Sequence, residues 1–127
     1  MSAKSAAGYR ALFGDASTSR TLTASDTTVA DLIAVKSTSH TIFVQKVTIG
    51  VTTSAAQNWT LQDDATTPIV LAVLPNSASV APHEWDFGAR GFACTEAKNL
   101  DLVVSSAGVA GSVTIEAYQK LTALTVD

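Results

Sequence analysis

The sequence predicts an all-β protein, and more narrowly an antiparallel β-sandwich of seven or eight strands. Segments rich in Val, Ile, Thr and aromatic residues recur at about ten-residue spacing after residue 29. Turn-forming residues separate these segments, as in Pro75-Asn76-Ser77. No stretch after residue 29 shows convincing helical periodicity. Short strands with regularly spaced turn signals are typical of β-sandwiches.

The longest predicted strand covers residues 40–49, where β-branched and aromatic residues alternate. Phe43, Val47 and Ile49 are expected on one face of it, because successive side chains of a strand point to opposite faces. The strands expected after it cover residues 58–62, 69–74, 83–87, 99–105 and 112–120.

Three of these strands carry more specific expectations. Residues 69–74 form a continuous apolar run, which predicts a strand buried on both faces. Residues 99–105 and 112–120 are joined by a glycine-containing loop and predict a hairpin. Tyr118 is expected on the face opposite Val113, Ile115 and Ala117 of the last strand, as an exception to the core-like positions of most rings.

The segment "PHEWDF", residues 82–87, concentrates a histidine, two carboxylates and two rings. Strand alternation puts Trp85 and Phe87 on the core face together with His83. The two carboxylates then face outward, away from the histidine, so they cannot easily share a metal ion with it. We interpret this segment as a packed strand with no acid/base pair.

The chain is predicted to divide into an N-terminal arm, residues 1–28, a β-sandwich domain, residues 29–121, and a C-terminal tail, residues 122–127. Eight of the twelve residues from 17 to 28 are Ser or Thr. Short hydroxyl side chains compete for backbone hydrogen bonds and add little buried surface, so an extended arm is expected there. The alternative is that this segment adds a strand to the sandwich.

A short apolar segment precedes the Ser/Thr-rich stretch and is our candidate for partner contact. It contains Tyr9, Arg10, Leu12 and Phe13, which have no assigned place in the sandwich. One interpretation is a hook that docks on a partner molecule. The other is a tail that packs on its own domain.

Composition argues against several classes of function. The formal net charge is −3, and the eight Lys and Arg residues are scattered singly, so we predict no nucleic-acid binding. No apolar run is long enough to span a membrane. Only 15% of residues are charged, which suggests that other chains cover part of the surface.

The residue pattern also predicts that this protein is not an enzyme. Cys94 is the only cysteine, and His40 and His83 have no recognisable triad context. The pair Asp63-Asp64 lacks the spacing of a calcium loop. Common nucleotide, hydrolase and zinc motifs do not occur, so no catalytic residue, cofactor or metal is predicted. A binding or structural role is therefore favoured.

The order of segments across about 88 residues resembles a family of virion proteins. The segments are "HTIFVQKVTIG", "WTLQDDATTPIV", "LPNSASVAPHEWDF" and "NLDLVVSSAGVAGSVTIEAYQK". This order resembles small jelly-roll decoration (cement) proteins of tailed bacteriophage capsids, and the related β-sandwich modules of phage fibres. The family has no catalytic residues to transfer to this sequence.

The resemblance implies a jelly-roll-like sandwich and a structural role on the outer surface of the capsid. It implies binding to the major capsid protein as a homo-oligomer, commonly a trimer, that bridges and stabilises capsid subunits. The alternative is a phage fibre or a receptor-binding or glycan-binding module. Sugar sites usually display exposed aromatic rings, and most rings here occupy core-like positions.

Overall fold

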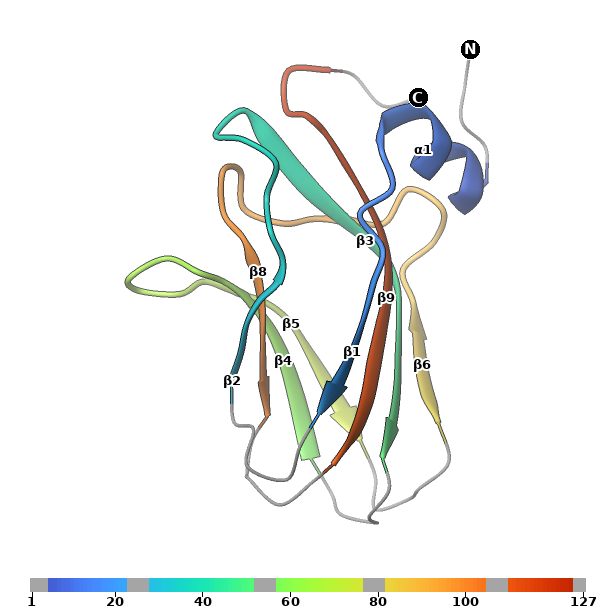
Figure 1. Cartoon of the computed structure of the whole chain (residues 1–127), viewed down its shortest axis with the longest axis vertical. Coiled ribbons are helices and arrows are strands. Elements are labelled where there is room, and N and C mark those ends of the chain that lie inside the picture. The colour runs from blue at the N-terminus through green and yellow to red at the C-terminus, as the bar shows by residue number, and fades with distance from the viewer. Residues whose placement is uncertain (1–4, 23–27, 52–56, 77–81, 105–109, 125–127) are drawn as a thin grey trace.

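The computed structural model describes residues 5–22, 28–51, 57–76, 82–104 and 110–124. It contains one helix and nine strands within those residues (Figure 1). The elements are α1 (Ala6–Phe13), β1 (Thr18–Leu22), β2 (Thr28–Ile33), β3 (His40–Val51), β4 (Gln57–Asp63), β5 (Val70–Asn76), β6 (His83–Asp86), β7 (Phe92–Ala93), β8 (Leu100–Val104) and β9 (Gly111–Leu121).

The strands form two antiparallel sheets that pack face to face, which confirms the predicted β-sandwich (Figure 1). Sheet A has the order β1-β9-β3-β6, with β7 also paired to β3, and sheet B has the order β2-β8-β4-β5. The pairs are nested along the chain: β1 with β9, β2 with β8, β3 with β6 and β4 with β5. This nesting is a long hairpin rolled into two sheets, which is the jelly-roll arrangement.

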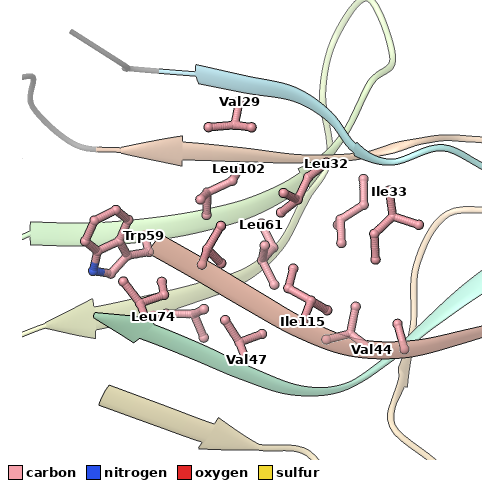
Figure 2. Close-up of a cluster of buried hydrophobic side chains, with 14 of the residues drawn as sticks. Val29, Leu32, Ile33, Val44, Val47, Trp59, Leu61, Leu74, Leu102 and Ile115 are labelled. Carbon is pink, nitrogen blue, oxygen red and sulfur yellow. The ribbon is translucent and has the colours of Figure 1, made fainter. Parts of the chain in front are cut away.

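The core lies between the two sheets and is apolar throughout (Figure 2). Its largest member is Trp59 of β4, which is completely buried. Sheet B adds Leu61 and Leu102, and sheet A adds Val47 and Ile115, all with no exposed surface. Burying side chains of this size stabilises the fold by about 1.5–3 kcal/mol each, before conformational entropy is subtracted.

The β6 strand confirms the alternation expected for "PHEWDF". Burial alternates from half-buried His83 to exposed Glu84, half-buried Trp85 and exposed Asp86. Trp85 and Phe87 pack against the core cluster from the edge of sheet A. The two acidic side chains point outward, as predicted.

The alternation predicted for residues 40–49 is wrong because β3 contains a bulge. Val44 pairs with Ala117 and Lys46 pairs with Glu116, so Gln45 is an extra residue on β3. An extra residue reverses the alternation on either side of it. Ile42 and Val44 therefore share the core face with Val47 and Ile49, while Phe43 lies on the outer face.

Two further expectations about strands are also wrong. Residues 99–105 and 112–120 do not form a hairpin, because β8 lies in sheet B and β9 in sheet A. Residues 69–74 are not buried on both faces, because β5 is an edge strand of sheet B. Val70 and Val73 are 56% and 54% exposed, whereas Leu74 is 2% exposed.

The described part of the N-terminal segment lies against the sandwich and is not a separate arm. Thr18–Leu22 is the edge strand β1, which pairs with β9, and Leu22 enters the core. The alternative that this segment adds a strand is therefore what the structure has. Residues 23–27 of the Ser/Thr-rich stretch lie outside the described residues.

Candidate partner-binding surfaces

Helix α1 begins and ends with ordinary capping chemistry. The Ser5 side chain accepts a hydrogen bond of 3.0 Å from the backbone N–H of Gly8. At the other end, Gly14 has φ of 131°, and its N–H donates to the carbonyl of Arg10. Such a positive φ favours glycine, so the sequence itself fixes where the helix stops. The chain then turns back to enter β1.

A stack of aromatic rings attaches α1 to the outer face of sheet A. Phe43 and Tyr118 are cross-strand neighbours, with ring centroids 4.9 Å apart and planes only 2° from parallel. The rings of Tyr9 and Phe13 in the helix stack on the ring of Tyr118, with centroid–centroid distances of 5.4 and 5.7 Å. The Tyr118 hydroxyl donates to the carbonyl of Arg90 at 2.7 Å.

Tyr118 is consequently buried completely, which is opposite to the exposed position that we predicted. Burial is the main cause that raises the pKa of its phenol to about 12.

The bulge in β3 provides a second attachment for the helix. Gln45, the extra residue of β3, is 1% exposed and lies under α1. Its amide group donates to the carbonyls of Ala6 and Ala89, and its oxygen accepts a 2.9 Å hydrogen bond from Arg10. The bulge therefore places an amide where it can satisfy backbone groups of two separate segments.

Three of the four predicted contact residues hold the helix on its own sheet. Tyr9 is buried, Phe13 is half-buried in the aromatic stack, and Arg10 is half-buried and bound to Gln45. Leu12 points outward, and its side chain is 46% exposed. The segment is therefore a tail packed on its own domain, and Leu12 is its one large apolar side chain that is exposed.

The end of β9 adds two more exposed leucines at the end of the molecule that carries α1 (Figure 1). Leu121 and Leu124 are 44% and 49% exposed. Lys120 holds this last turn, because its buried ammonium donates to the carbonyls of Leu121, Thr122 and Leu124. The leucines of this end thus project from backbone that is fixed in place.

The outer face of sheet B is a second candidate surface. One row of outward side chains crosses all four strands, because Val73 pairs with Thr60, Thr60 with Val103, and Val103 with Thr28. Every member of this row is β-branched and uncharged. Together with the exposed side chains of Ile69 and Val70, we call it the sheet B face.

The sheet B face contrasts with the corresponding region of sheet A. There, Asp86, Lys46 and Glu116 form a row of three charged residues across neighbouring strands. A second row includes Thr114 and Thr48 and ends on Glu84, which lies 3.3 Å from the Lys46 ammonium. Charged residues therefore cross the outer face of sheet A, whereas the row through Val73, Thr60, Val103 and Thr28 contains none.

Exposed large hydrophobic side chains occur in only two groups among the described residues. The first group lies at the end of the molecule that carries α1, which we call the helix end. The second group lies on or beside β5. The six residues are Leu12, Leu121 and Leu124, and Ile69, Val70 and Val73. Solitary exposed apolar residues are normal, whereas groups of them mark candidate interaction surfaces.

The groups with potential chemistry are occupied in structural roles. Burial raises the pKa of the Cys94 thiol to about 12, so the thiol stays protonated and unreactive. The Nδ1 atom of His40, the first residue of β3, lies 2.6 Å from the hydroxyl of Ser37 in the preceding turn, so the two side chains form a local hydrogen bond. No cluster of His, Cys, Asp or Glu within the described residues is placed to hold a metal ion.

Two buried carboxylates in sheet B have opposite electrostatic environments. Burial alone would raise the pKa of Asp63, but hydrogen bonds from Ile69, Thr95 and Ala65 hold it below its ordinary value. Burial raises the pKa of Asp101, and the nearby carboxylates of Asp31, Asp64 and Asp63 add to that rise.

Sequence reasoning missed the sheet B face, although a signal for it was present. The apolar run at residues 69–74 is bounded by Pro68 and followed by Pro75, which lies within β5. Proline lacks an N–H for the ladder, so a proline within a strand indicates an edge strand. An apolar edge strand must expose part of its surface.

No protein-family model matches this chain, and no curated protein matches it. No helix in the described ranges is long and apolar enough to cross a membrane.

Proposed function

We propose that this chain is a structural protein of bacteriophage virions that binds the outer surface of the capsid and stabilises it by bridging capsid subunits. The proposed partner is the major capsid protein. The proposed assembly is a homo-oligomer, with a trimer as the expected form, and the role is binding without catalysis. The resemblance of segment order to decoration proteins and the jelly-roll pairing of the strands support this proposal.

The observation that carries the proposal is the division of the exposed apolar side chains into two separate groups. A protein that clamps a shell needs one surface for the shell and another for its own copies. Binding across subunits stabilises only the assembled capsid, by mass action. Joining copies multiplies a modest affinity per site, because the second contact becomes intramolecular.

We assign capsid contact to the helix end. Leu12 would insert into the capsid surface, and Leu121 and Leu124 would add contacts from the same end of the sandwich. Tyr9 and Phe13 would act as anchors that hold α1 in the binding geometry, and Arg10 would fix it through Gln45. Because the helix is already docked on sheet A, little ordering entropy would be lost on binding.

The fibre or glycan-binding alternative is less well supported by side-chain exposure. All eight aromatic residues lie in the described ranges, and each is buried or half-buried. A sugar platform needs an accessible ring face, and Tyr118, the candidate that the sequence suggested, is covered by α1.

Counting copies in purified particles tests the proposal most simply. Mass spectrometry of particles of the phage that encodes this chain measures its ratio to the major capsid protein. We expect the number of copies of this chain per particle to be of the same order as the number of copies of the major capsid protein. A few copies per particle would favour the fibre alternative, and absence from the particle would overturn the virion role.

A charge at Leu12 tests the contact itself. We expect Leu12→Lys to weaken co-sedimentation with capsids that lack the protein by at least about tenfold, since a lysine must be desolvated there. Thr21→Lys on β1, also exposed and on an edge strand, is the control and should bind normally. Equal binding by both variants would contradict the assignment of α1.

A further inference from the structure

We infer that β5 and the adjoining sheet B face form the contact between copies of this chain. This inference rests on the proposed homo-oligomer but does not require capsid binding. The side chains that would meet are Ile69, Val70 and Val73, which are between 54% and 56% exposed. They are the most exposed large hydrophobic side chains of the described chain.

The edges of the two sheets differ in how they meet other molecules. Natural edge strands avoid pairing by carrying charges, prolines or bulges. Among the outer edges, β1 carries Arg20, β2 carries Asp31 in a bulged region with φ of 54°, and β6 carries Glu84 and Asp86. No charged residue occurs in β5, so this seven-residue edge strand tolerates an apolar neighbour.

The backbone of β5 is poorly suited to simple extension of the sheet. Its register shifts opposite Leu61 and Gln62, which leaves Leu71 as an extra residue, and Pro75 provides no N–H. Both features interrupt a hydrogen-bonded ladder with an added strand. The partner is therefore expected to pack on side chains, with the valines as the main contact.

A second copy is the occupant that the charge pattern favours. A partner for this surface must itself be uncharged and apolar, because a charge buried against Val70 and Val73 would lose its hydration without gaining a polar contact. The chain itself presents such a surface. When symmetric copies bring their β5 strands to a common axis, the strands themselves bring no like charges together. The same arrangement through β6 would place Glu84 and Asp86 beside their own copies.

The row that crosses sheet B extends this contact inward from the edge. Thr60 and Val103 are half-buried, uncharged, and in direct register with Val73. An edge strand alone offers less area than the roughly 800 Å² per partner that a stable interface buries. Continuity of the β-branched row provides further area without introducing a charge.

Charge insertion at the proposed contact provides the test. The full chain and its Val73→Lys, Val70→Lys and Thr21→Lys variants are compared by light scattering across micromolar concentrations. Thr21 is a matched control, because it is also an exposed, β-branched residue on the outer face of an edge strand. Circular dichroism and the melting midpoint of each variant at low concentration establish that it is folded.

We expect the unmodified chain and Thr21→Lys to be oligomers, and the two valine variants to dissociate at least about tenfold more readily. A folded Val73→Lys protein that remains an oligomer would overturn the inference, as would a monomeric unmodified chain or equal dissociation of Thr21→Lys. If Val73→Lys fails to fold, Val70→Lys decides.

The same proteins separate this inference from the proposed function. Dissociation of the valine variants, together with absence of the chain from phage particles, would sustain the β5 contact and overturn capsid decoration. Presence in particles with no effect of the valine changes on assembly would do the reverse.

Discussion

The outer faces of the two sheets differ in how their apolar residues are covered. On sheet A, the chain covers its own apolar residues: α1 lies over Phe43 and Tyr118, and charged residues occupy the strands beyond the helix. On sheet B, no helix among the described residues covers the outer face, and Val70 and Val73 are exposed. The difference shows that the chain can cover an outer face with its own helix, and it supports the proposal that the exposed apolar residues of sheet B meet another molecule.

The largest expected loss of stability comes from removing the Tyr118 ring under α1, which tests the comparison between the two faces. Tyr118→Ala removes the ring on which Tyr9, Phe13 and Phe43 stack, and should lower the free energy of unfolding by about 3–5 kcal/mol in urea titrations. Tyr118→Phe loses only the hydrogen bond to Arg90 and should cost about 1 kcal/mol. Val73→Ala on the sheet B face should cost less than about 0.5 kcal/mol in the dissociated chain.

Similar losses for Tyr118→Ala and Val73→Ala would show that the two faces do not differ in the way described. The measurement is made at concentrations low enough to populate the dissociated chain, so that assembly does not contribute.

The next effect concerns Asp63, whose folded pKa is lowered. A group of this kind stabilises the fold above its unfolded pKa, and the contribution is lost as the pH falls through its folded pKa. Asp63→Asn should therefore cost about 2 kcal/mol at neutral pH, since three hydrogen bonds to a carboxylate weaken. The cost should shrink toward the acid range, as followed by urea titrations at several pH values.

Asp101 should respond with the opposite sign and a smaller size. Its folded pKa is raised, so its favourable contribution is present below the unfolded pKa and is lost as the pH rises through the folded pKa. Asp101→Asn keeps an oxygen that can accept from the N–H of Asp31, which now bonds to the carboxylate at 2.7 Å. The variant should therefore be more stable than the unmodified chain at neutral pH.

That advantage should disappear in acid, where both side chains are neutral. A variant that is less stable at neutral pH would mean that the carboxylate is favourable in this position.

The smallest expected effect comes from the ion pair on sheet A. Lys46 and Glu84 are 3.3 Å apart, with side chains 33% and 53% exposed. Exposed pairs of this kind contribute roughly 0.2–1 kcal/mol and are screened by salt. Lys46→Gln should change the melting midpoint very little, and a large loss would show that the charged row is a structural requirement of sheet A.

The β-sandwich could be predicted because alternation over short segments is a local property. The outward acids and inward rings of β6 followed from alternation, and so did the core face of β9, with Val113 and Ile115 buried. The orientation of residues in β3 could not be predicted in this way, because the bulge at Gln45 depends on pairing with β9. Bulges reverse alternation without a strong local signal.

The candidate surfaces were predictable in part. The apolar segment at Tyr9, Leu12 and Phe13 was identified, but its docking on Tyr118 brings together residues about a hundred positions apart in the sequence. Ser5 and Gly14 were available as helix boundary signals for that segment. The exposure of Val73 depends on the position of β5 at a sheet edge, which only the topology defines.

A cryo-EM map of the virion tests the central claim most directly, because it places both surfaces at once. The account predicts jelly-roll density on the outside of the shell, with Leu12 and α1 against the capsid and the β5 strands of neighbouring copies in contact. Density in which Val70 and Val73 face solvent while α1 points away from the shell would contradict it.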